Sequence, residues 1–209
     1  MMSRGIELSF TIPVRKRVFK HVFQFRIELC FIEPLIWRRI QVPETCTFYD
    51  LHVAIQDAMG WEDRHLHDFE IGGRKPVRIE CPFAEPMPGE QVQYWTSEVP
   101  LKKFLKCQGS SMTYDYDFGD GWRHKVVLED VMPRRPRTVY PICLDGDRSC
   151  PPDCGGIGGY TRCMESLQKK DPEDEFTVWL GDWRPDEFDA KKVKFDDPRR
   201  RFLMAFDED

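Results

Sequence analysis

The sequence predicts a single α+β domain with a mixed or antiparallel sheet. Three observations support this prediction: alternating apolar and polar residues near the N-terminus, an Asp-Gly turn between two strand-like runs in the middle, and helical spacing in the last third. Period two is typical of half-buried strands, whereas apolar residues three and four apart indicate helices. We expect the helices to pack against the sheet.

The first predicted element is an N-terminal hairpin. Apolar residues recur with period two along its first strand: Phe19, Phe23, Phe25, Ile27, Leu29 and Phe31. Polar residues occupy most positions between them, so we expect one long half-buried strand. Pro34 interrupts the alternation, which resumes over residues 36–42, as in a strand that returns after a turn.

A helix is predicted after the second strand, over Phe48–Met59. The Thr47 hydroxyl can cap its first turn, and Gly60 can end it because glycine adopts left-handed backbone angles easily. The expected apolar face consists of Leu51, Ala54, Ile55 and Ala58. Such a face predicts packing against the sheet.

Two short strands, 66–71 and 77–80, and a proline-rich loop, 82–88, are expected next. A central hairpin then joins the strands 112–118 and 122–131. Its turn contains Asp-Gly, a strong hairpin signal because both residues tolerate positive φ.

The last third is predicted to be mainly helical. A segment rich in Cys, Pro and Gly, 141–159, is expected to be a loop, followed by helices over 160–170, 173–180 and 185–193. Residues 196–209 fit either a last helix or a loose tail.

Composition excludes several classes of protein. The chain has 209 residues and a formal net charge of −5, which gives no general attraction to nucleic acid. No run approaches the ~20 apolar residues of a membrane span, and the basic N-terminus lacks the apolar region of a secretory signal. These features favour the cytoplasm, where the eight cysteines would be reduced or bound to a metal.

The first candidate site surrounds Trp61. If His65 and His67 both lie in a strand, they point to the same face and could form a pair of metal ligands. The alternative is that one imidazole packs against Trp61 or Phe69 and bonds a backbone carbonyl.

The second candidate site lies at the central hairpin. Asp115 and Asp117 would share one strand face with His124 just across the turn, so carboxylates and an imidazole could converge there and bind a divalent metal or transfer protons. Asp117, Asp120, Trp122 and His124 are the ligand-binding candidates of this hairpin. The alternatives are turn chemistry for Asp120 and cross-strand pairing of Asp115 or Asp117 with Arg123 or Lys125.

The third candidate site is a zinc site at Cys143, Cys150 and Cys154. Thiolates are soft ligands that suit zinc, and a loop with little apolar content gains much from a metal. A fourth ligand would have to come from Cys163 or from a histidine. The alternative is that these cysteines are buried or idle thiols.

These segments together resemble the plasmid pRiA4b ORF-3-like family, also described as passenger proteins of an insertion element with a resolvase-type label. The resemblance covers about residues 21–195, and it implies that the chain consists of a basic extension, 1–20, the α+β domain, 21–195, and a C-terminal tail, 196–209. It rests on these runs: Pro34-Leu-Ile-Trp-Arg-Arg-Ile-Gln-Val-Pro43, Leu51-His52, Ala58-Met-Gly-Trp61, His65-Leu-His67-Asp-Phe69, Tyr114-Asp-Tyr-Asp-Phe-Gly-Asp-Gly-Trp122 with His124, Cys143-Leu-Asp-Gly146, Cys150-Pro-Pro152, Gly155-Gly156 and Gly159-Tyr160.

The resemblance implies a single α+β domain and no established reaction. The chain departs from the family pattern where Pro-Pro-Glu-Asp-x-Gly-Gly is shortened to Pro151-Pro-Asp-Cys-Gly-Gly156, which moves Cys154 relative to Cys150. A shared metal geometry is therefore not implied.

The sequence favours an accessory module that binds an unknown protein or small molecule through the first two candidate sites. The alternative is a metal-dependent hydrolase that uses His65, His67, His124 and Asp117. A third hypothesis, an accessory protein of mobile-element recombination, predicts salt-sensitive DNA binding through the basic extension.

Overall fold

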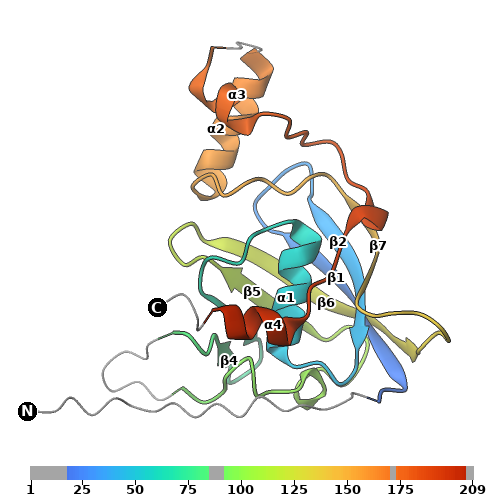
Figure 1. The fold of residues 1–209 in the computed structure, drawn as a ribbon. Helices are drawn as coiled ribbons and strands as arrows, with labels where there is room; N and C mark the ends of the chain where they lie inside the picture. Colours follow the sequence, from blue (N-terminus) through green and yellow to red (C-terminus); the bar gives the residue numbers. More distant parts are fainter. Residues whose placement is uncertain (1–17, 85–91, 170–172, 206–209) are drawn as a thin grey trace, which may run out of the picture.

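The computed structural model describes residues 18–84, 92–169 and 173–205 (Figure 1). In chain order the elements are β1 (His21–Leu29), β2 (Trp37–Pro43), α1 (Phe48–Met59), β3 (His67–Ile71), β4 (Val77–Glu80), the 3-10 helix η1 (Leu101–Lys103), β5 (Ser111–Tyr116), β6 (Trp122–Pro133), β7 (Ile142–Asp147), α2 (Gly156–Lys169), α3 (Glu175–Leu180), the 3-10 helix η2 (Ala190–Lys192) and α4 (Pro198–Met204). No helix in these ranges has the length and apolar run that a membrane span requires.

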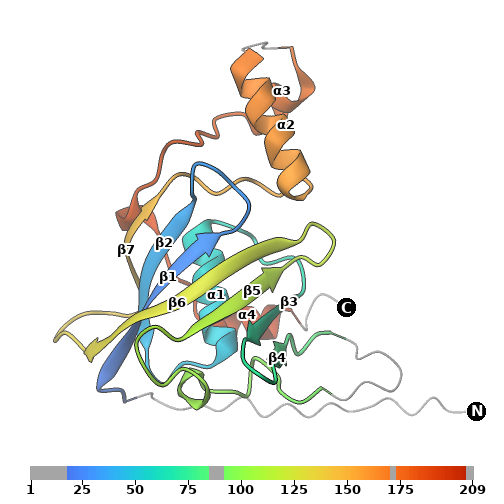
Figure 2. The same ribbon diagram turned by 180° about the vertical axis from the view of Figure 1, so that it is seen from behind.

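The strands form one seven-stranded sheet in the order β4-β3-β5-β6-β1-β2-β7, and each neighbouring pair is antiparallel. The predicted α+β fold and both predicted hairpins are therefore confirmed. Helices α1 and α4 lie on one face of the sheet, while Figure 2 shows the opposite face without a helical cover over its centre.

Helix α1 forms where the sequence predicts it because its ends are capped locally. The Asp50 amide donates to Thr47 Oγ1 (3.2 Å) and the Thr47 amide donates to Asp50 Oδ2 (2.6 Å), while Gly60 takes φ +86°. The apolar face packs with Phe25 and Ile40 in the main core. This burial, rather than helix propensity, supplies most of the stability of such a helix.

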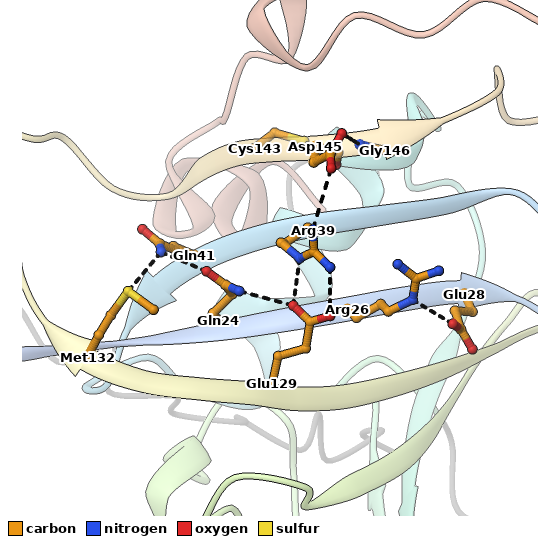
Figure 3. A network of polar contacts seen from close by, with 10 residues as sticks. All are labelled: Gln24, Arg26, Glu28, Arg39, Gln41, Glu129, Met132, Cys143, Asp145 and Gly146. Atoms are coloured by element: carbon orange, nitrogen blue, oxygen red, sulfur yellow. Dashed lines mark hydrogen bonds and ion pairs between the residues drawn. The ribbon is translucent and has the colours of Figure 1, made fainter.

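The uncovered face of the sheet carries a polar network (Figure 3). Arg39 makes a two-point contact with Glu129, with Nε to Oε2 at 2.6 Å and a terminal nitrogen to Oε1 at 3.0 Å. Gln24 donates to the same carboxylate (3.0 Å), and the Arg26 guanidinium lies 4.0 Å from the centre of the Trp37 ring. The polar residues at every second position of β1 therefore lie on the solvent side of the sheet, where they take part in this network.

Three details of the prediction are wrong. The segment 141–159 is not all loop, because β7 gains its hydrogen bonds from the free edge of β2 and α2 already begins at Gly156. The expected helix 185–193 contains only the short η2, and Phe188 lies beneath the Arg38 guanidinium, 3.7 Å from it. Phe31 is 75% exposed with φ +64°, since β1 ends before it.

The C-terminal segment forms a helix, α4, so the first of its two predicted alternatives is confirmed over Pro198–Met204. The remaining part of that segment, 206–209, lies outside the described residues. So do residues 1–17 of the basic extension and residues 85–91, which include much of the predicted proline-rich loop.

Candidate functional site

The turn of the β5–β6 hairpin builds one wall of the candidate site. The Asp117 carboxylate accepts hydrogen bonds from the amides of Gly119 (2.9 Å) and Asp120 (3.2 Å). Positive φ falls on Asp117 (+54°) and Gly121 (+69°), so the turn is longer than the predicted Asp-Gly pair alone. This local hydrogen bonding fixes the Asp117 side chain, and its second oxygen, Oδ2, faces His65.

Two backbone contacts bring the segment before β3 against this turn. The Asp117 amide donates to the Leu66 carbonyl (2.9 Å), and the Arg64 amide donates to the Tyr116 hydroxyl (3.0 Å). His65 is held between these two contacts. Its ring also lies edge-on to Tyr116, with centroids 5.8 Å apart.

A third segment, the loop before α2, completes the cluster. The Gly156 amide donates to Asp120 Oδ2 (2.9 Å), and a Cβ on Gly156 would lie 2.5 Å from the Asp120 carbonyl oxygen. Only glycine permits this close approach, which brings Asp153 to the turn. Asp153 Oδ2 lies 3.0 Å from His65 Nε2.

His65, Asp117 and Asp153 together form a possible metal site. His65 Nε2 lies 3.5 Å from Asp117 Oδ2, and one ligand atom from each of the three residues lies within 4.8 Å of the other two. Among the described residues this is the one such set of three or more His, Cys, Asp or Glu side chains. Three nitrogen and oxygen ligands suit a divalent cation and leave coordination positions open.

A further carboxylate lies beside this cluster. Burial, the negative charge of Asp117 and a hydrogen bond with Asp153 together raise the pKa of Asp120. Like charges at short range disfavour ionisation, so a bound divalent cation would relieve this repulsion.

A cavity of about 880 Å³ adjoins the cluster, and His65 borders both. Its lining consists of Tyr49, His52, Glu62, Asp63, Arg64, His65, Leu66, His67, Cys81, Phe83, Asp196, Asp197, Arg200, Arg201, Met204 and Ala205. These residues come from α1, from the segments on either side of β3 and β4, and from the C-terminal segment with α4. The cavity is large enough for a small-molecule ligand.

Two stacked histidines lie in the cavity lining. The rings of His52 and His67 are 3.5 Å apart at 9°, and each residue is 1% exposed. His52 Nε2 lies 2.7 Å from Asp63 Oδ1, and its Nδ1 lies 2.8 Å from the Tyr114 hydroxyl. Burial, and then the neighbouring charge of His52, hold the pKa of His67 well below its ordinary value, so that His67 is uncharged at neutral pH.

The predicted pairing of His65 with His67 as ligands on one strand face is wrong. Strand β3 begins at His67, so the alternation that would align the two rings does not extend back to His65. His65 instead contacts two carboxylates, and His67 Nε2 lies 3.3 Å from Thr96 Oγ1.

The other residues of the predicted face, which include Trp61, Trp122 and His124, pack beneath the surface next to the cluster. Burial lowers the pKa of His124 to about 4, and its ring lies edge-on to Trp61. Trp122 is also buried. The Trp61 indole stacks on Tyr116 and donates to the Pro151 carbonyl (2.9 Å), two residues before Asp153. These rings therefore fix the loop that carries Asp153.

The structure does not bring Cys143, Cys150 and Cys154 together as one ligand set. All eight cysteines are free thiols, and burial is the largest cause that raises the pKa of each of these three. Cys143 lies on β7, whereas Cys150 and Cys154 lie in the loop before α2. Zinc binding by these cysteines stays a prediction.

Sequence reasoning found two of the three clustered residues and missed Asp153. Its signal, an acidic residue beside Pro-Pro and Gly-Gly, was obscured by the cysteines around it. The predicted cross-strand pairing was correct for Asp115, which makes a two-point contact with Arg123 (both 2.8 Å).

Comparison with known proteins gives three findings. A family model described as plasmid pRiA4b ORF-3-like protein matches residues 21–193. The uncharacterized protein y4hQ of Sinorhizobium fredii (strain NBRC 101917 / NGR234) is 32% identical over 167 residues, which cover 78% of this chain and 80% of that protein. The crystal structure of a protein of unknown function, MM3350 of Methanosarcina mazei Go1, is similar with a TM-score of 0.76, is 38% identical, and covers 85% of this chain and 99% of that one.

Proposed function

The chain belongs to the plasmid pRiA4b ORF-3-like family, and we propose that it is a binding module that holds a small polar ligand through a divalent cation. The curated relative is uncharacterised and the solved structure is of unknown function.

One observation carries the proposal: His65, Asp117 and Asp153 converge at the edge of the cavity. A cation held there by three side chains would keep positions for ligand oxygens that enter from the cavity. The polar lining of the cavity, which includes the neutral His67, suits a ligand that carries hydrogen-bonding groups. A predicted zinc ion at the cysteines would be a second, separate metal.

Metal binding tests the proposal directly. We expect isothermal titration of Mn²⁺ or Mg²⁺ into metal-free protein without a histidine tag to show one site. Asp117→Asn should weaken binding about tenfold or more, since it removes one charge but keeps an oxygen that can accept from the turn amides.

His21→Ala is a matched control, because His21 also contacts a carboxylate, Glu44 at 3.4 Å, but lies at the start of β1. It should bind the cation like the wild type. Wild-type binding by Asp117→Asn, or no cation binding below about 1 mM, would contradict the proposal.

A second candidate function is metal-dependent hydrolysis. The observation that favours it is the position of the Asp120 carboxyl group, which contacts Asp153 and could exchange a proton next to an open coordination position. A panel of phosphoesters, nucleotides and peptides, assayed with and without added cation, tests it. Turnover that requires the cation and His65 would support hydrolysis, and no turnover on any of these substrates would count against it.

A further inference from the structure

Part of the cavity lining comes from a segment that lies beyond the family match. The family model ends at residue 193, and residues 196–205, here named the strap, follow it. The strap contributes six residues of the cavity lining: Asp196, Asp197, Arg200, Arg201, Met204 and Ala205. Figure 1 shows α4, the helix of the strap, beside α1 on the covered face of the sheet.

Arg201 ties the strap to the cavity. One guanidinium nitrogen contacts both Asp57 Oδ1 and Asp196 Oδ2 at 2.6 Å, and the other lies 3.7 Å from Asp63 Oδ2. The side chains of Asp57 and Asp63 are only 6% and 10% exposed, so water screens their negative charges poorly. The positive charge of Arg201 compensates them. The Asp196 amide also donates to Asp57 Oδ2 (2.9 Å).

A small apolar contact adds to this ionic one. Phe202 is buried against Tyr49, Val53 and Phe83, in a cluster separate from the main core. Its ring meets that of Tyr49 edge-on, with centroids 5.1 Å apart. Leu203 and Met204 of the same helix are exposed.

The strap is too short to be a stable helix by itself. Helix α4 has seven residues, whereas isolated helices below about 12–15 residues are marginal in water. Its structure therefore depends on the contacts of Arg201 and Phe202. Because Phe202 belongs to a cluster outside the main core, breaking these contacts would leave the packing of the main core in place.

We propose that the strap is a displaceable cover of the cavity, latched by Arg201, which opens to admit the ligand. The role of the opening in ligand entry rests on the proposed function. The opening itself can be tested without any ligand or metal, so a failure of either idea is seen separately.

Cys81 reports on the opening because it lines the cavity and is 2% exposed. Burial raises its pKa to about 11, so it should react slowly with a maleimide while the strap is closed. Cys163, which is 0% exposed on α2, serves as a control within the same molecule. Peptide mass spectrometry would follow maleimide labelling of the two cysteines in the full chain.

We expect Arg201→Gln to label Cys81 about tenfold faster than the wild type, with Cys163 unchanged. Arg199→Gln, on the same helix, should label Cys81 at the wild-type rate. Equal Cys81 rates in Arg201→Gln and Arg199→Gln would overturn the proposal.

If Arg201→Gln also speeds the labelling of Cys163, the substitution has disrupted more of the fold than the strap. The variant Asp196→Asn then tests the proposal. This variant removes one partner of the latch at a side chain that is mostly exposed and leaves no buried charge without a partner. Faster labelling of Cys81 alone would then support the cover, and unchanged labelling would refute it.

Discussion

Two ionic networks among the described residues lie on opposite faces of the sheet; each pairs an arginine with a carboxylate, and they differ in burial. On the uncovered face, Arg39 and Glu129 bond each other while both are in partial contact with water. On the covered face, His52, Asp63 and Arg201 lie between α1, the segment before β3 and the strap. Water screens the first network more than the second, so the second is expected to contribute more strongly to stability and binding.

The substitution Asp63→Asn tests this difference between the two networks most strongly. The change removes a charge that faces both buried His52 and Arg201, and we expect it to reduce the free energy of unfolding by about 3 kcal/mol. Urea denaturation at neutral pH measures this loss. A loss below ~1 kcal/mol would mean that the buried network contributes no more to stability than the partly exposed one.

The same variant should also change acid stability. Burial alone would raise the pKa of Asp63, but the charge and hydrogen bond of His52, with Arg201, outweigh it, so the folded pKa lies below 3.8. The stability from this group is present above the unfolded pKa and is lost as the pH falls through the folded one. Asp63→Asn should therefore lose less stability than the wild type below about pH 4.

Buried His124 predicts a second pH effect of nearly the same size. Burial lowers its pKa from 6.5 to about 4, so the unfolded chain takes up this proton before the folded chain does. Stability should fall between pH 6.5 and pH 4, by up to about 3 kcal/mol from this group. His124→Phe should flatten the profile of urea midpoints, whereas Arg39→Gln on the uncovered face should keep the wild-type slope above pH 5. A wild-type slope in His124→Phe would contradict the assignment.

The smallest effect is expected on the uncovered face. Glu129→Gln breaks the two-point contact with Arg39, yet both side chains lie partly in water. The free energy of unfolding should change by less than about 1 kcal/mol, and less still at high salt. Chemical denaturation at two ionic strengths checks this, and a larger effect that salt does not reduce would show that this network is poorly screened.

Sequence patterns found the elements that local interactions determine. Helix α1 has the predicted bounds because Thr47 and Gly60 lie next to the backbone groups that they satisfy. Strand β7 and helix α4 were harder to predict, because one depends on the edge of β2 and the other on contacts with Asp57 and Tyr49. These partners are distant in the chain.

The candidate site shows the same limit. His65 and Asp117 were both chosen from the sequence, but with His67 and His124 as partners, because alternation along a strand was the available rule. The partner that completes the cluster, Asp153, reaches it through a close contact of Gly156 with the hairpin turn. No periodicity in the sequence encodes such a contact.

His65 and Asp153 are 88 residues apart in the chain, so their cluster exists only after the whole domain has folded. A cation that binds only the folded chain would shift the folding equilibrium by mass action, by about 2.7 kcal/mol at a hundred times its dissociation constant. The supply of that cation would then set the fraction of unfolded chains that cellular proteases can degrade. Through this cluster, the abundance of the protein would follow the availability of the metal.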